Sequence, residues 1–164
     1  MNEIDAAPSS EELERLAQRL HVLEAKDEIR RLMAAYVHAR DFREGSVSEC
    51  FTADAVWEGL GPLAETLGVH EGREAIAERF AGQIPPALHL LANESITVDG
   101  EQAVGDWTYL QPMVLAGRAM WVAAQYHNDF QREQGRWRIR HVRIEGIFQV
   151  PYEEGWAEAA FFAR

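Results

Sequence analysis

Apolar residues in the first quarter of the chain recur at the spacing of a helix. Steps of three and four residues place side chains on one face of a helix, and a continuous apolar stripe of this kind is typical of a helix that packs on a core. We therefore expect two helices, or one bent helix, to fill residues 11–40, after a polar segment 1–10 that frays. The stripe consists of Leu13, Leu16, Leu20, Leu23, Ile29, Leu32, Met33, Tyr36 and Val37.

Two shorter helices are indicated further along. Ser46 is followed three residues later by Glu49, which is the spacing of a capping box and predicts a short helix there. The stretch "EGREAIAERF" has the composition of another short helix, and Pro85 and Pro86 prevent its continuation.

After Pro86 the pattern changes to alternating polar and apolar residues, with turn signals at Asp99-Gly100 and Gln134-Gly135. Alternation over long runs between such turns predicts antiparallel strands joined by hairpins. Helices followed by a meander of strands give an α+β fold, in which the helices cover one face of the sheet. No repeat or linker divides the chain, so we expect a single domain over residues 11–164.

Charge and composition narrow the partners. The 27 acidic and 16 basic side chains give a net charge of -11 without a basic cluster, which disfavours nucleic acid and anionic membranes. No run approaches the roughly 18 apolar residues of a membrane span. Cys50 is the only cysteine, so an intrachain disulfide is impossible, and the reducing cytoplasm is the expected location.

Several kinds of site have no motif in this sequence. There is no P-loop, no GxGxxG after a strand, no GxSxG elbow and no CxxC pair. The six histidines show no spacing typical of zinc ligands. We therefore expect neither a metal nor an organic cofactor.

His89 is the histidine most suggestive of chemistry, because leucines surround it in "ALHLLAN", on an expected strand. A partly buried imidazole next to a carboxylate is the usual arrangement of a general base, and Asp41, at the end of the long helix, is the candidate carboxylate. The alternative is that His89 is structural and that Asp41 only ends the helix. In a regular helix, moreover, Arg40 lies nearer the centre of the apolar stripe than Asp41.

Three segments resemble, in order and spacing, the SnoaL-like branch of the NTF2-like superfamily, which includes bile-acid 7α-dehydratase, scytalone dehydratase and lindane dehydrochlorinase. They are "IRRLMAAYVHARDFREGSVSECFTADAVWEG", "HLLANESITVDGEQAVGDWTYL" and "QYHNDFQREQGRWRI". The resemblance implies a cone in which N-terminal helices pack in the concave face of a strongly curved, mixed but mostly antiparallel sheet. It also implies a deep apolar pocket at the mouth of this cone.

The resemblance further implies roles for particular residues. Asp41 and His89 match the Asp–His pair with which such enzymes abstract a proton, Tyr36 matches an active-site tyrosine, and Arg143 is a weaker match to a family arginine. Gln111 stands where one relative has a further acid. Neither this acid nor a second family histidine is present, so the reaction class carries over better than the substrate.

The expected reaction is a cofactor-independent elimination of dehydratase type. His89 takes a proton, Asp41 holds the imidazolium, and Tyr36 and Arg143 donate hydrogen bonds to an oxygen that gains charge or leaves. For the aromatic residues the alternative is a place in the core, and for Arg143 it is the solvent side of its strand. The residues expected to hold a small cyclic or polycyclic apolar substrate, besides Gln111, are Trp57, Trp107, Tyr109, Trp121, Tyr126 and Phe148.

Two other functions stay open: an isomerase of the ketosteroid type, and a non-catalytic ligand-binding or assembly domain. A homo-oligomer, trimer or dimer, is expected through the outer face of the sheet. We also expect His89→Ala to abolish turnover with little change in melting temperature.

Overall fold

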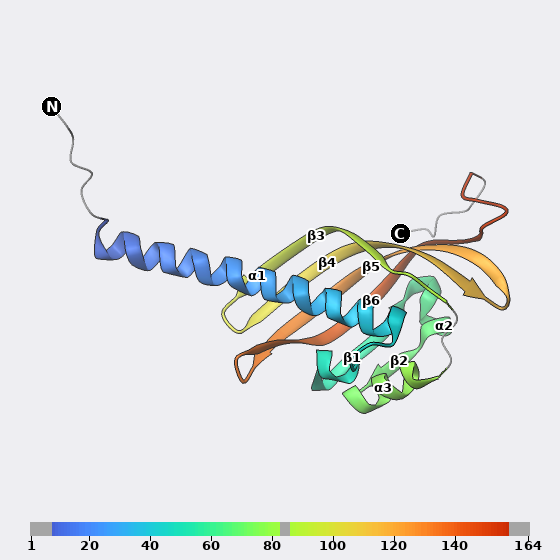
Figure 1. Cartoon of the computed structure of the whole chain (residues 1–164), viewed down its shortest axis with the longest axis horizontal. Helices are drawn as coiled ribbons and strands as arrows, with labels where there is room; N and C mark the ends of the chain where they lie inside the picture. Colours follow the sequence, from blue (N-terminus) through green and yellow to red (C-terminus); the bar gives the residue numbers. More distant parts are fainter. Residues whose placement is uncertain (1–7, 83–85, 158–164) are drawn as a thin grey trace.

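The computed structural model describes residues 8–82 and 86–157, which form helices packed against a six-stranded sheet (Figure 1). The strands lie in the order β2-β1-β6-β5-β4-β3. Only β1 and β6 pair in parallel, and all other neighbours are antiparallel. The sheet is thus mixed and mostly antiparallel, which confirms the predicted α+β class.

Helix α1, Ser10–Phe42, is one continuous helix. A capping box starts it, because the Ser9 hydroxyl accepts from the Glu12 backbone N–H and the Glu12 carboxylate accepts from the Ser9 N–H. It ends at Arg43, whose left-handed φ of 59° is typical of a C-terminal cap. The two-helix alternative is therefore wrong.

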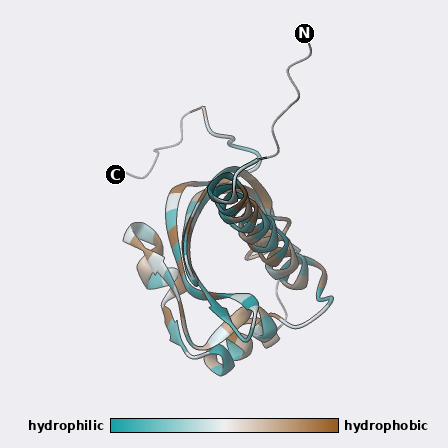
Figure 2. Cartoon of the chain, turned by 90° about the vertical axis from the view of Figure 1, so that its left-hand side faces the viewer, coloured by the Kyte–Doolittle hydropathy of each residue, from teal (hydrophilic) through white to brown (hydrophobic). Residues whose placement is uncertain are grey.

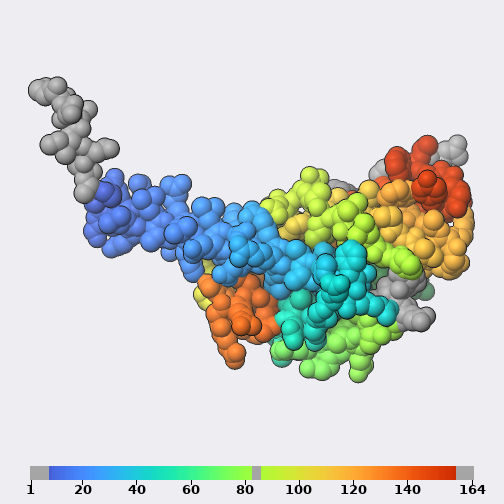
Figure 3. Space-filling view, viewed as in Figure 1, coloured from blue at the N-terminus to red at the C-terminus, as the bar shows by residue number. Residues whose placement is uncertain are grey.

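The N-terminal half of α1 runs beyond the sheet (Figures 1 and 3). Its leucines, Leu13, Leu16, Leu20 and Leu23, are 49 to 61% exposed, so the prediction that they pack on the core is wrong. A helix of 33 residues is about 50 Å long, at a rise of 1.5 Å per residue. The described strands pack only against its second half, where Ala25, Ile29, Met33, Tyr36 and Ala39 are buried.

Short elements connect α1 to the long strands. The predicted capping box at Ser46 is absent, because a three-residue 3₁₀ helix, Ser48–Cys50, forms without a side-chain cap, and the Ser46 hydroxyl instead bonds that of Ser48 at 2.8 Å. The predicted helix in "EGREAIAERF" is present as α3, Arg73–Ala81. The prediction that Pro85 and Pro86 stop this helix falls partly outside the described residues, because Pro85 is not among them. The connection also contains β1, Phe51–Leu60; a 3₁₀ helix, Gly61–Leu63; α2, Ala64–Leu67; and β2, Val69–Glu71.

The remaining strands form the predicted meander, and two of its three hairpin turns lie at the expected dipeptides. The third turn, at Ala116-Gly117 between β4 and β5, was not predicted. Gly100 follows the last residue of β3, and Gln134 and Gly135, both with positive φ, join β5 to β6. Bulges between Ala123 and Ala124 and between Asp129 and Phe130 shift the β5–β6 register, so β6 turns a different set of side chains inward along its length. The strands are β3, Leu90–Asp99; β4, Gln102–Leu115; β5, Arg118–Glu133; and β6, Arg136–Pro151.

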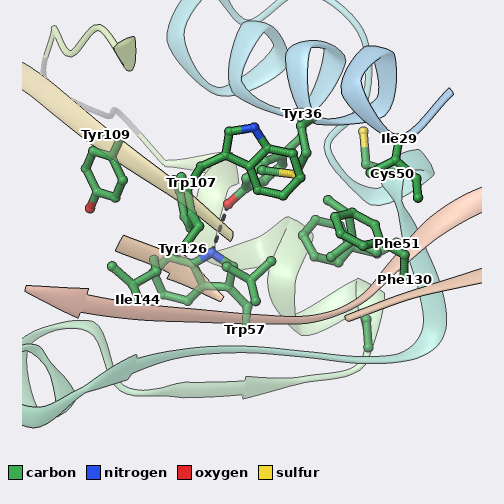
Figure 4. Packing of buried hydrophobic residues seen from close by; sticks show 14 of the residues in the cluster. Ile29, Tyr36, Cys50, Phe51, Trp57, Trp107, Tyr109, Tyr126, Phe130 and Ile144 are labelled. Atoms are coloured by element: carbon green, nitrogen blue, oxygen red, sulfur yellow. Dashed lines mark hydrogen bonds between the residues drawn. The ribbon is translucent and has the colours of Figure 1, made fainter. Parts of the chain in front are cut away.

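The core lies between α1 and the face of the sheet that it covers (Figure 2). Aromatic rings dominate it, and Figure 4 shows the Trp57 indole N–H pointing at the Tyr36 hydroxyl, which accepts its hydrogen bond at 2.9 Å. Phe51 meets the Tyr36 ring edge-on, with 5.5 Å between centroids. No helix within the described ranges is long and apolar enough to cross a membrane.

Candidate active site

Asp41 and His89 are in direct contact. The ring nitrogen Nδ1 of His89 lies 2.6 Å from Oδ1 of Asp41, and the backbone N–H of His89 donates to Oδ2 at 2.7 Å. The side chain of His89 is only 1% exposed, and that of Asp41 is 3% exposed. A carboxylate is an acceptor only, so Nδ1 carries the proton and Nε2 keeps a free lone pair.

The local structure explains why these two residues meet. Asp41 occupies the last turn of α1, five residues after the buried Tyr36 and two after the buried Ala39. The sequence suggested that His89 lies on a strand, but it lies just before β3. The segment that carries it is tied to β4, because the Leu88 N–H donates to the Pro112 carbonyl at 3.1 Å. Helix end and strand start are thereby held together at one edge of the core.

Burial and hydrogen bonding set the protonation states. Burial and the nearby positive charge of Arg40 lower the pKa of His89 and outweigh the opposing effect of Asp41. Burial acts to raise the pKa of Asp41, but the two hydrogen bonds from His89 overcome it, so this pKa is lowered. At neutral pH the pair is a carboxylate beside a neutral imidazole, which is the form a general base requires.

A cavity of about 540 Å³ adjoins this pair, and both residues contribute to its wall. Its size suits a small organic ligand. Most of its lining is apolar, and Gln111 adds a buried amide. The apolar lining consists of Trp57, Leu63, Leu67, Phe80, Met113, Leu115, Val122 and Ile144.

Arg40 also lines the cavity and links the pair to the core. Its Nη1 donates to the Tyr126 hydroxyl at 3.0 Å and to the Tyr36 hydroxyl at 3.4 Å. Tyr36 and Tyr126 are completely buried and do not line the cavity, so neither hydroxyl can reach a ligand directly. Sequence reasoning treated Arg40 and Asp41 as competitors for the inward position. The end of α1 directs both toward the cavity.

The aromatic residues expected at the pocket divide into three groups. Trp57 and Tyr109 line the cavity, and the Tyr109 ring lies 5.4 Å from that of His89. Trp107 is buried against Phe130 in the core and does not line this cavity. Trp121 and Phe148 also lie outside the lining, and both rings instead contact Trp156, with centroids 5.9 and 6.4 Å apart. Trp107, Trp121, Phe148 and Tyr126 therefore do not line this cavity, although Trp107 borders a separate hollow of about 410 Å³ that His89 also lines.

Arg143 lies on the opposite side of β6 from Ile144, which lines the cavity. There it makes a two-pronged ion pair with Asp129, at 2.7 and 3.2 Å, and donates to Nδ1 of His141 at 2.9 Å. Strand alternation explains this position, because neighbouring residues face opposite sides of a sheet. The expected contact of Arg143 with a substrate in this cavity is therefore wrong.

A wider hollow of about 870 Å³ lies between α1 and the end of the β5–β6 hairpin. His38 and Glu44 form an ion pair at 3.0 Å on its wall, but their side chains are 52% and 74% exposed. Solvent screens the attraction within an exposed pair, so this pair is only weakly held. The chemistry therefore favours the smaller cavity. In the described part of the chain, no three His, Cys, Asp or Glu side chains are grouped to hold a metal ion.

Sequence reasoning assigned no role in the site to three arginines that line the smaller cavity, Arg40, Arg43 and Arg79. Arg40 and Arg43 flank Asp41 in sequence, and this proximity was an available signal. Arg79 comes from α3, and only the packing of α3 against β1 brings it to the cavity.

Comparison with known proteins gives a consistent picture. The SnoaL-like domain family matches residues 21–143. An uncharacterized protein of Mycobacterium tuberculosis is 32% identical over 130 residues, covering 73% of this chain and 85% of that protein. An NTF2-like protein with a cystatin-like fold from Novosphingobium aromaticivorans is 25% identical, with a TM-score of 0.67 over 85% of this chain and 92% of that one. A hexachlorocyclohexane dehydrochlorinase, LinA-type3 from Novosphingobium barchaimii, is 19% identical, with a TM-score of 0.69 over 87% and 96% of the two chains.

Proposed function

Since the chain belongs to the SnoaL-like family, we propose that it is a cofactor-independent lyase of dehydratase type acting on a small cyclic substrate. The observation that carries this proposal is the buried Asp41–His89 pair at the wall of a cavity. Buried titratable pairs in a ligand-sized cavity are characteristic of catalytic sites.

The proposed reaction begins with His89. Its Nε2 accepts a proton from a substrate carbon, and the electron pair of the broken C–H bond forms a carbon–carbon double bond. A hydroxide or halide on the adjacent carbon departs with its bonding pair. A departing hydroxide takes the proton back from Nε2 of His89 and leaves as water, whereas after loss of a halide His89 releases this proton to solvent. The carboxylate of Asp41, 2.6 Å from Nδ1, stabilises the imidazolium that forms.

Negative charge that develops on the substrate needs donors at the cavity wall. Arg40, Tyr109 and Gln111 are the candidates, because all three line the cavity. Tyr36 supports the site indirectly, since its hydroxyl accepts hydrogen bonds from Trp57 and Arg40. This assignment gives Tyr36 a positioning role in place of the direct contact expected from the sequence.

The fold shared with the dehydrochlorinase supports an elimination, because that enzyme is named for the loss of hydrogen chloride. At 19% identity this likeness establishes the fold alone. The reaction therefore rests on the Asp41–His89 geometry.

Proton abstraction can be tested without knowing the natural substrate. A panel of cyclic β-hydroxy ketones, β-hydroxy acids and halogenated rings is incubated with the protein in D₂O and analysed by mass spectrometry. Loss of water or hydrogen halide shows a lyase, an isomer of unchanged or deuterium-shifted mass shows an isomerase, and binding without either reaction shows a ligand-binding domain. Only the first outcome supports the proposal.

His89→Gln is the decisive variant, because glutamine is polar and of similar size but provides no base. We expect it to bind panel compounds and to eliminate nothing. His38→Gln is the matched control, since His38 also pairs with a carboxylate near the end of α1 but is exposed to solvent. Equal elimination by wild type and His89→Gln would exclude His89 as the base.

A further inference from the structure

The charge of the cavity wall is opposite to that of the whole protein. The chain carries a net charge of -11, yet Arg40, Arg43 and Arg79 line the cavity and Asp41 is its only acid within the described residues. Three arginines and one aspartate leave an excess of two positive charges when His89 is neutral. Cationic clefts on an acidic protein attract anions and concentrate them locally.

Asp41 does not neutralise these arginines through direct pairing. Both of its carboxylate oxygens are engaged by His89. None of the three guanidinium groups lies within 4.0 Å of a carboxylate of the described residues.

The guanidinium of Arg40 is incompletely satisfied. Its Nη1 is shared between two tyrosine hydroxyls, and its Nε is buried without a hydrogen-bond partner. A buried donor without a partner costs free energy, and a buried cation costs more, unless an anion or acceptor joins it. The protein therefore provides a cation at the catalytic end of the cavity and leaves part of its hydrogen-bonding capacity unused.

A second arginine meets the same aromatic ring. The guanidinium carbon of Arg40 lies 4.6 Å from the centre of the Phe80 ring, and that of Arg79 lies 5.9 Å from it. Arg79 also approaches the Trp57 ring at 6.0 Å. The faces of aromatic rings attract cations, so Phe80 and Trp57 help to hold both arginines at the cavity wall. Two positive charges at one wall favour an anionic ligand.

We propose that the cavity binds organic acids, with the carboxylate held by Arg40 and Arg79 and the ring system against the apolar side chains of the lining. The inference rests on the proposed function, because it takes the cavity as the substrate site and names the class of substrate. The group that loses its proton then faces His89, next to Arg40 in the wall. Arg43 stands at the rim, where its Nη2 donates to the Gly82 carbonyl at 2.7 Å.

A purely structural role for these arginines makes a different prediction. Arg40 and Arg43 sit at the C-terminal end of α1, where basic side chains offset the partial negative charge of the helix. In that case their removal lowers stability and leaves ligand preference unchanged. Charge preference in binding is therefore the readout that separates the two roles.

The experiment measures binding of trans-cinnamate and of its neutral amide, cinnamamide, by isothermal titration calorimetry. The two probes share a ring and length and differ in charge. We expect cinnamate to bind at least about tenfold more tightly at low ionic strength, and the difference to shrink as salt screens the charges. Arg40→Gln and Arg79→Gln should each reduce this preference severalfold. Arg79 is exposed, so Arg79→Gln keeps the test valid if Arg40→Gln does not fold.

Arg140→Gln is the matched control, because Arg140 is an exposed arginine of β6 outside the cavity lining, and its loss changes the net charge equally. It should keep the full preference. Equal affinity for the two probes, no binding of either, or an unchanged preference in both cavity variants would overturn the inference. Failure of the proposed function looks different, since cinnamate would then still be preferred while no acid in the D₂O panel reacts.

Discussion

The Asp41→Asn variant tests the catalytic pair most directly, because it changes one atom and keeps the shape of the side chain. In the wild type, Oδ1 accepts from the His89 ring and Oδ2 accepts from the His89 backbone N–H. Asparagine has one acceptor oxygen, so its amide NH₂ must face one of these two donors. If the oxygen keeps the backbone N–H, the imidazole must take the other tautomer, with Nδ1 accepting and Nε2 carrying the proton.

The structure sets the expected magnitudes. A hydrogen bond to a charged group contributes about 1.5–3 kcal/mol, and replacing a buried carboxylate by a neutral amide offsets part of this loss. A net loss near 2 kcal/mol lowers the melting temperature of a domain of this size by about 4–8 °C. The wrong tautomer removes the base, and a comparable change in a serine-protease triad reduces turnover about 10⁴-fold. We expect a fall in kcat/KM of about 10³- to 10⁴-fold in a variant that remains folded.

Nitrogen-15 NMR of the histidine rings reads the tautomer without any substrate. Among the six histidines, the signals of His89 are identified as those missing from the spectrum of His89→Gln. Wild-type His89 should show a protonated Nδ1 and an unprotonated Nε2, and Asp41→Asn should reverse them. A wild-type ring protonated at Nε2, or an Asp41→Asn protein that keeps both the original tautomer and full kcat/KM, would refute this account of the pair.

Three further predictions concern pH, stability and assembly. The pKa of His89 is lowered from 6.5, so below about pH 6.5 the folded protein binds fewer protons than the unfolded chain. The free energy of unfolding, measured by denaturant titration, should therefore decrease as the pH falls below 6.5. The value of kcat/KM should decrease only below that pH. The lowered pKa of Asp41 acts in the same direction, with further stability lost as the pH falls below about 3.8. His89→Ala should lower the melting temperature by several degrees, because it leaves a cavity and removes a hydrogen bond from buried Asp41. This differs from the small change expected from the sequence. An unchanged melting temperature in calorimetry would contradict it. Assembly as a trimer or dimer stays a prediction, and light scattering that shows a monomer at micromolar concentration would exclude it.

Local signals in the sequence predicted the arrangement of elements well. The Asp99-Gly100 and Gln134-Gly135 dipeptides mark two of the three hairpins, where Gly100 and Gly135 take the positive φ that glycine adopts cheaply. The third turn, Ala116-Gly117, was not predicted. The helix pattern likewise extended to the end of α1. The same pattern failed for Leu16 and its neighbours, since periodicity shows that a helix has an apolar face but not whether a partner covers it.

The candidate site was predicted in part. Asp41 and His89 were identified by residue type, local context and family resemblance, and they meet at 2.6 Å. Trp121 and Arg143 were misplaced, because the side of a strand that faces a cavity depends on bulges and on where the cavity ends. Neither is readable from alternation alone.

By itself the sequence determined the α+β class, the turns and the chemical types available for catalysis, because these depend on interactions between residues close in the chain. Tertiary structure alone decided that Arg40 lies beside His89, that Arg79 reaches the same cavity from α3, and that Tyr36 is sealed in the core. These placements depend on contacts between segments far apart in sequence. The charge of the cavity, and with it the class of ligand proposed here, is consequently a property of the fold.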